Sequence, residues 1–119
     1  MGSESTSTEP VLDLESALAR LDGDRELFAD MAGYTIEDTP KLFEEIRTAV
    51  STEDATAVRM KAHALKGLVA GCGGVRATIV AQSLEDAGHS GDLSRAESLV
   101  TSLEEELAEL TKALETHRR

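Results

Sequence analysis

The residues best suited to chemistry lie in one short stretch, KAHALKGLVAGCGG, which spans residues 61–74. A helix here, with about 3.6 residues per turn, buries a stripe whose members lie within about 40° of one another. The stripe consists of Val58, Ala62, Leu65, Val69 and Cys72. His63 lies roughly 140° from the centre of this stripe. The spacing therefore predicts an imidazole that is exposed to solvent.

The neighbours of His63 on the same helical face are cationic or very small. Arg59 precedes it by one turn, and Lys66, Gly67 and Ala70 follow at i+3, i+4 and i+7. A glycine inside a helix costs about 1 kcal/mol relative to alanine, and close approach of another body to the imidazole would explain Gly67. This set suits a nucleophile that serves an anionic substrate presented by a partner protein, with Lys66 balancing charge on a transferring phosphoryl group.

Metal and nucleotide chemistry find little support in the sequence. No carboxylate, cysteine or second histidine lies three or four residues from His63, so we expect no metal site on this helix. The chain has no glycine-rich phosphate loop, so we expect no ATP site. His89, in a glycine-flanked turn, and His117, in the C-terminal tail, are interpreted as bystanders.

Hydrophobic spacing predicts the helices that position this stretch. A short helix is predicted from Val11 to Leu21, and a second from about residue 24 to residue 50. Pro40 either kinks the second helix or begins a new one that is capped by Thr39. In the next segment, Ser51 with Asp54 three residues later resembles a capping box and is expected to start the helix that carries His63.

The remaining chain predicts two further helices. One runs from about Val75 to Ala87 and stops at Gly88, and the last begins at about Asp92. The last helix has a sustained heptad seam made of Leu93, Ala96, Val100, Leu103, Leu107, Leu110 and Leu114. Short connections make consecutive helices antiparallel neighbours, so we expect an all-α, up-down-up-down four-helix bundle with a short extra N-terminal helix.

Length and composition bound the class of protein. The 119 residues allow one domain, with residues 1–10 as a disordered leader or linker and residues 11–117 as the helical bundle. A net charge of −11 argues against nucleic acid and against an anionic membrane surface. No apolar run is long enough to insert into a membrane, and a single cysteine permits no internal disulfide. We therefore expect a cytoplasmic location.

The sequence also resembles a known family. The residues AHALKG (62–67), the glycine at position 73 and LEDAGHSGDL (84–93) resemble the histidine-containing phosphotransfer (HPt) domain of two-component phosphorelays. The resemblance implies that His63 carries a phosphoryl group, that Lys66 contacts it electrostatically and that Gly67 leaves room for a receiver domain. In many members a polar residue 22 positions after the histidine bonds the other ring nitrogen; here this position is Glu85, which also fits a solvated helix end.

The resemblance implies a function and a set of partners. His63 would accept a phosphoryl group from a receiver-domain aspartate and pass it to another receiver, with no ATP-dependent kinase activity in the bundle. No cofactor of its own is expected, since Mg²⁺ would belong to the receiver domain. Gly67, Ala70 and Arg59 would form the docking surface for response-regulator receiver domains. A hybrid histidine kinase in the same chain or complex is a further partner of this type, and the protein is expected to be a monomer.

Two alternative functions stay open at this point. Within the family, the chain could instead be the phosphoacceptor domain of a chemotaxis-type histidine kinase. In a different class, it could be a non-catalytic helical module that uses the seam of residues 93–114 for dimerisation or partner binding.

Overall fold

The computed structural model describes residues 8–118, and all of its regular structure in that range is helical. The helices are α2 (Leu14–Arg20), α3 (Arg25–Ser51), α4 (Ala55–Gly71), α5 (Val75–Ser90) and α6 (Ala96–Glu115). The predicted all-α class is confirmed. Most of the predicted leader, residues 1–7, lies outside the described residues.

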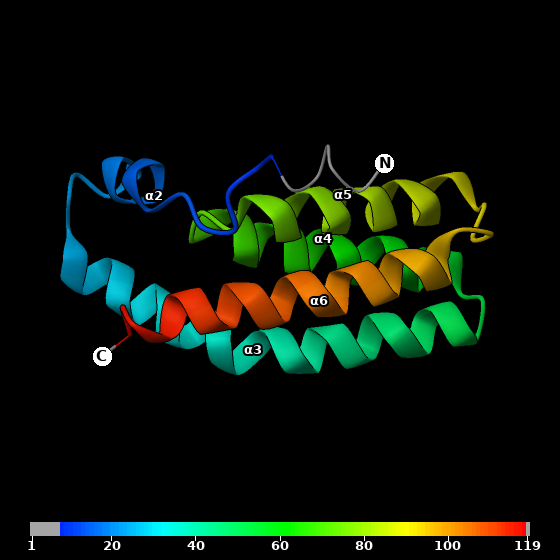
Figure 1. Cartoon of the computed structure of the whole chain (residues 1–119). Helices are drawn as coiled ribbons and strands as arrows, with labels where there is room; N and C mark the ends of the chain where they lie inside the picture. Colours follow the sequence, from blue (N-terminus) through cyan, green and yellow to red (C-terminus); the bar gives the residue numbers. More distant parts are fainter. Residues whose placement is uncertain (1–7, 119) are drawn as a thin grey trace.

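The four longer helices form a ring in which each packs against two others. α3 and α5 both pack against α4 and α6. The chain reverses direction at each connection between these helices, and α2 lies at the end where α3 begins (Figure 1). The core between the helices is mainly aliphatic, and the stripe predicted on α4 is fully buried: Val58, Ala62, Leu65, Val69 and Cys72 are each 0% exposed.

α3 is one continuous helix that contains Pro40. Asp24 caps it by accepting a hydrogen bond from the backbone N–H of Leu27 at 3.0 Å. Thr39 is buried inside the helix at 3% exposure, whereas Pro40 lies on the exposed face. Of the two interpretations of Pro40, the structure therefore has the single helix, and no new helix begins at Thr39.

The prediction that Ser51 starts α4 is wrong. Ser51 is the last residue of α3, and its hydroxyl donates to the backbone oxygen of Thr48 at 2.9 Å. The chain then turns through Glu53, which has a positive φ of 56°. Asp54 caps α4 by accepting from the N–H of Ala57 at 3.1 Å. Two turn residues, Thr52 and Glu53, precede the cap, so α4 begins later than the capping-box pattern indicates.

Two other predicted boundaries also move. Gly88 does not end α5, which continues to Ser90 and is followed by Gly91 in the left-handed region. α6 begins at Ala96 and not at Asp92, because the Asp92 carboxylate accepts from the backbone N–H of Ser94 at 3.1 Å and holds a turn there. Hydrogen bonding from the Ser94 side chain, and then from its backbone N–H, lowers the pKa of Asp92.

α2 is attached to the C-terminal end of α4. The N–H of Asp13 donates to the backbone oxygen of Gly73 at 2.8 Å, and Arg20 donates to the backbone oxygen of Ala70 at 3.0 Å. Asp13 also caps α2 by accepting from Ser16, so α2 begins at Leu14 and not at Val11. Gly73 has a φ of +81°, and a Cβ there would lie 2.6 Å from the Asp13 oxygen. Glycine at this position therefore has a structural reason within the fold.

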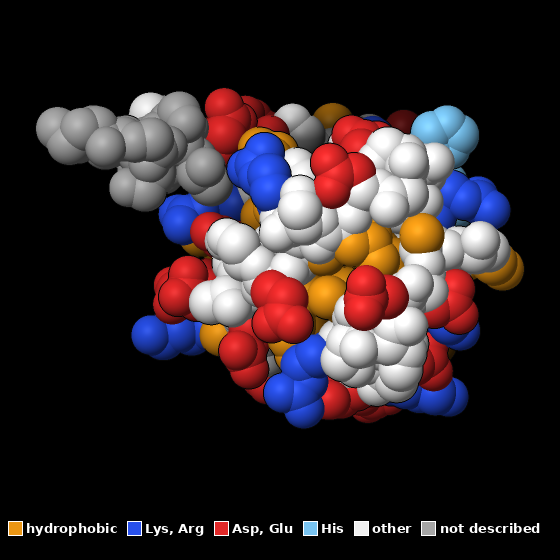
Figure 2. Space-filling view, turned by 90° about the vertical axis from the view of Figure 1, so that its right-hand side faces the viewer, with side chains coloured by type: hydrophobic (Ala, Val, Ile, Leu, Met, Phe, Trp, Pro, Cys, Tyr) orange, Lys and Arg blue, Asp and Glu red, His pale blue; other side chains and the backbone are white. Residues whose placement is uncertain are grey.

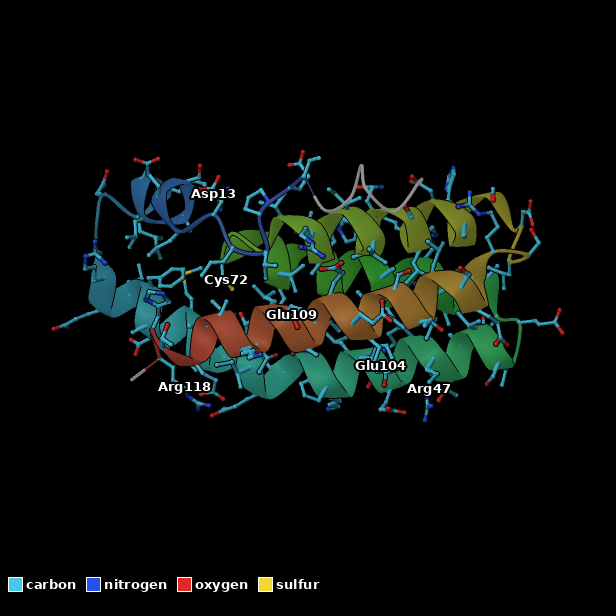
Figure 3. All side chains as sticks on the ribbon, viewed as in Figure 1. Asp13, Arg47, Cys72, Glu104, Glu109 and Arg118 are labelled. Carbon is cyan, nitrogen blue, oxygen red and sulfur yellow. The ribbon has the colours of Figure 1, made fainter. Side chains whose placement is uncertain are left out.

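Cys72 lies inside the bundle, as Figure 3 shows. Its Sγ is 2.8 Å from the hydroxyl oxygen of Thr35 on α3, and burial raises the pKa of the thiol. The predicted core role of Cys72 is confirmed by its complete burial.

The opposite end of the bundle carries the α3–α4 and α5–α6 connections and faces the viewer in Figure 2. Hydrophobic side chains gather near its centre, with charged side chains around them. A hollow at this end is lined by Val50, Ser51, Glu53, Ala55, Gly91, Leu93, Ser94 and Glu97. Among residues 8–118, no helix is both long and apolar enough to cross a bilayer.

Candidate functional site

His63 lies in the middle of α4, and its side chain is 68% exposed. The ring is held on one side only. Its Nδ1 atom is 3.0 Å from Oε2 of Glu85, which α5 places 22 residues later in the chain. In the part of the chain that the structure describes, no hydrogen bond engages Nε2. The exposure predicted from the helical spacing is confirmed.

Glu85 bridges His63 and Lys66. Its other oxygen, Oε1, forms an ion pair with Nζ of Lys66 at 2.7 Å, and its side chain is only 21% exposed. The bond from Lys66 lowers the pKa of Glu85, the bond from His63 lowers it further, and partial burial opposes both. An ionised carboxylate can only accept hydrogen bonds, so Nδ1 carries a proton, and in the neutral form of the ring the lone pair therefore lies on Nε2.

Lys66 bends toward α5 and is less exposed than its position on the helix indicates. The side chain is 24% exposed, and its ammonium group donates to Oε1 of Gln82 at 2.9 Å in addition to the pair with Glu85. The amide nitrogen of Gln82 in turn donates to Oδ1 of Asp86 at 2.9 Å. Sequence analysis missed Gln82. The available signal was its position three residues before Glu85, which places both side chains on one face of α5.

Packing among residues 8–118 gives no reason for Gly67. It is exposed, and no described atom lies within 4 Å of an added Cβ apart from those of its own helix backbone and chain neighbours. At Gly88, by contrast, an added Cβ would lie 2.5 Å from the backbone nitrogen of Arg59. Gly67 therefore leaves open space on the outer side of α4, one turn after His63.

The other predicted docking residues also lie on this side of α4. Arg59 is exposed, and Ala70 is half-buried with its backbone oxygen bound to Arg20. Met60, which sequence analysis did not select, is 57% exposed. The outer side of α4 thus combines an exposed imidazole with small, apolar and cationic groups.

α4 is locally cationic in an acidic protein. It contains Arg59, Lys61 and Lys66 but no Asp or Glu. Lys61 pairs with Glu45 at 3.2 Å, and Lys66 pairs with Glu85. Arg59 forms no ion pair with any residue in the described range 8–118. It is therefore the cation on α4 whose charge is left for an external partner.

The other two histidines, His89 and His117, have different surroundings from those of His63. His117 packs its ring edge-on against Phe28, with the ring centroids 5.8 Å apart. His89 is exposed in the last turn of α5. Within residues 8–118, no group of three or more His, Cys, Asp or Glu side chains is arranged to hold a metal ion.

Comparison with known proteins gives two matches. The model of the Hpt domain family matches residues 30–116, which is most of the chain. The fold is similar to the crystal structure of histidine-containing phosphotransfer protein B (HptB) from Pseudomonas aeruginosa PAO1, with a TM-score of 0.83 and 23% identity. That similarity covers 90% of this chain and 93% of the other. No curated protein sequence gives a significant match.

Proposed function

This chain belongs to the Hpt domain family, and we propose on that premise that it carries a phosphoryl group on His63 between receiver domains. The observation that carries the proposal is the asymmetric environment of the imidazole. Glu85 binds Nδ1 at 3.0 Å, while the side chain remains 68% exposed. One ring nitrogen is thereby fixed as the proton carrier, and the other is free to react.

In the proposed transfer, the lone pair of Nε2 attacks the phosphorus of a receiver aspartyl phosphate. A P–N bond forms while the P–O bond to the receiver aspartate breaks, and that aspartate leaves as a carboxylate. The proton stays on Nδ1, so the phosphorylated ring becomes cationic, and the Glu85 carboxylate stabilises it. In the onward step, a second receiver aspartate attacks phosphorus, the P–N bond breaks, and His63 leaves as a neutral imidazole.

We propose that Lys66 stabilises the negative charge that develops on the phosphoryl oxygens. Its ammonium group has three N–H donors, and Glu85 and Gln82 engage it through one oxygen each. One donor therefore remains for the transferring group. A cation at i+3 from the nucleophile lies on the adjacent turn of the same helix, within reach of that group.

We propose that receiver domains dock on the outer side of α4. Gly67 leaves space for the partner, Arg59 supplies an uncompensated positive charge, and Ala70 and Met60 supply small and apolar surface. Any Mg²⁺ used in the transfer would be held by the receiver, and the bundle would have no kinase activity of its own. The proposed scaffold is an up-down-up-down bundle of α3–α6, with the short α2 over one end.

The test is labelling by a phosphorylated receiver. A panel of receiver domains is charged with acetyl phosphate, mixed with the protein, and followed by phosphate-affinity electrophoresis with an acid-lability assay. We expect an acid-labile phosphate on wild type and none on His63→Gln, which retains a polar side chain but has no ring nitrogen. Equal labelling of His63→Gln would refute the assignment.

The same assay separates the alternatives. Labelling by a chemotaxis-type kinase with ATP, and by no receiver, would favour the phosphoacceptor domain of such a kinase. A stable dimer in light scattering that no donor labels would favour a non-catalytic helical module.

A further inference from the structure

Gln82 occupies a position next to Lys66 that the family resemblance does not account for. Its Oε1 atom accepts a hydrogen bond from Nζ of Lys66 at 2.9 Å, across the contact between α5 and α4. The same ammonium group pairs with Glu85 at 2.7 Å. Two residues of α5, three positions apart, therefore hold one lysine of α4.

Asp86 fixes which end of the Gln82 amide faces Lys66. The carboxylate of Asp86 accepts from the Gln82 nitrogen at 2.9 Å. Because a carboxylate accepts and an ammonium group only donates, the amide nitrogen must face Asp86 and the amide oxygen must face Lys66. In the opposite orientation, two donors would face each other at Lys66 and two acceptors would face each other at Asp86.

Gln82 also differs from Glu85 in charge. A lysine has a long, flexible side chain, and holding it in one geometry costs conformational entropy. A second carboxylate would hold the ammonium group but would also add a second negative charge beside it. A neutral amide oxygen holds the ammonium group without adding to the negative charge that Glu85 already supplies.

We propose that Gln82, oriented by Asp86, is a positioning residue for phosphoryl transfer that keeps Lys66 at His63 with its third N–H donor free. The proposal rests on the proposed function of His63. Gln82 acts through Lys66 and does not touch the reacting atoms.

The experiment uses phosphoramidate as a small phosphoryl donor, so that receiver docking plays no part. Its P–N bond breaks with release of ammonia as the new bond to His63 forms. Gln82→Met keeps the length of the side chain but removes the acceptor. The bond that is lost joins the Lys66 ammonium group to the Gln82 amide oxygen, and because Gln82 acts on the transfer only through Lys66, we expect about a threefold to tenfold lower labelling rate. Ser83→Ala is the matched control, since among the described residues the Ser83 hydroxyl bonds only to the backbone oxygen of Ile79 within α5.

A double-variant cycle tests whether Gln82 acts through the lysine. In a Lys66→Met background, Gln82→Met should cause no further loss of rate. A structural effect on the bundle would instead persist in that background. A second readout is independent of labelling: the ¹H–¹⁵N signal of the Lys66 ammonium group, visible when its exchange with water is slow, should weaken in Gln82→Met and stay unchanged in Ser83→Ala.

The outcomes distinguish this inference from the proposed function. If His63 is labelled in wild type and Gln82→Met is labelled at the same rate, the positioning role is wrong and the carrier function stands. An equal loss in the presence and absence of Lys66 would also overturn it. If neither phosphoramidate nor any receiver labels wild type, the proposed function fails and this inference fails with it.

Discussion

At the scale of single residues, Glu85 divides its carboxylate between two partners. One oxygen binds Nδ1 of His63 at 3.0 Å and the other pairs with Lys66 at 2.7 Å. The partners depend on one another, because protonation of Glu85 would weaken both contacts together. Glu85 therefore couples the tautomer of the imidazole to the position of the lysine.

The lowered pKa of Glu85 predicts a pH-dependent contribution to stability. A carboxyl whose pKa is lower in the folded state stabilises the fold above its unfolded-state pKa, and this contribution disappears as the pH falls through the folded-state pKa. Wild type should therefore resist urea better than Glu85→Gln near neutral pH, and the two should converge in acid. Urea unfolding at a series of pH values measures this, and a difference that stays constant into acid would contradict it.

The sequence predicts part of this site, and helix periodicity explains which part. The positions of His63, Lys66 and Gly67 relative to the buried stripe depend only on residues per turn, and the exposed placement of His63 and Gly67 is correct. The bend of Lys66 onto Gln82 depends on the register between α4 and α5. No local pattern encodes that register, so Gln82 was not found.

At the scale of helices, two glycines that look alike in sequence have opposite roles. Gly67 lies within α4, and a Cβ there would have no contact within 4 Å in the part of the protein that the structure describes. Gly88 lies within α5, and a Cβ there would lie 2.5 Å from the nitrogen of Arg59 and 2.7 Å from the oxygen of Ala55. Gly88 thus lets the backbones of α4 and α5 approach each other, and this contact helps to set the register that brings Glu85 to His63.

This difference predicts opposite effects of alanine. Gly88→Ala should lower the free energy of unfolding by about 1–3 kcal/mol, because the backbone atoms of α4 cannot move aside as a flexible side chain does. Gly67→Ala should raise it by up to about 1 kcal/mol, because alanine favours the helix and meets nothing. Chemical denaturation of both variants against wild type provides the measurement. A Gly88→Ala variant as stable as wild type would show that the helices separate at little cost.

Helix order and helix boundaries differ in how far the sequence predicts them. The all-α class and the succession of amphipathic helices follow from hydrophobic spacing. The stop predicted at Gly88 is wrong, because that glycine serves a contact with another helix and not a local turn. Neither Ser51 nor Asp92 starts a helix: Ser51 ends α3 and bonds back to Thr48, and Asp92 holds a turn by accepting from Ser94.

The sequence patterns also do not predict a partly buried ion pair between α5 and α6. Glu106 is 8% exposed and lies beside the heptad seam, where its carboxylate accepts a hydrogen bond from Arg76 at 3.0 Å. The leucines and the valine of the seam are buried as predicted, apart from Leu93, which is partly buried. The position of a buried charge beside such a seam depends on whether a neighbouring helix supplies a partner.

At the scale of the whole molecule, charge is distributed unevenly. The chain has a net charge of −11, yet α4 has three cations and no carboxylate. Glu104 and Glu109, labelled in Figure 3, lie on α6. Arg59 is the unpaired cation of α4 within residues 8–118, and it precedes His63 by one turn. An acidic partner would therefore be attracted to the site more than to the rest of the surface.

The uneven charge predicts that Arg59 accelerates docking of a receiver, whose phosphorylated site is anionic. Arg59→Gln should lower the rate of transfer from the receiver that labels His63 fastest by about twofold to fivefold at low salt. Salt screens exposed charges, so the difference should shrink as the ionic strength rises. Arg47→Gln is the matched control, because it removes the same charge from α3, where Arg47 pairs with Glu44 at 3.1 Å. Equal slowing of both variants would show that net charge, and not the position of Arg59, controls docking; a difference that ignores salt would instead indicate a short-range contact.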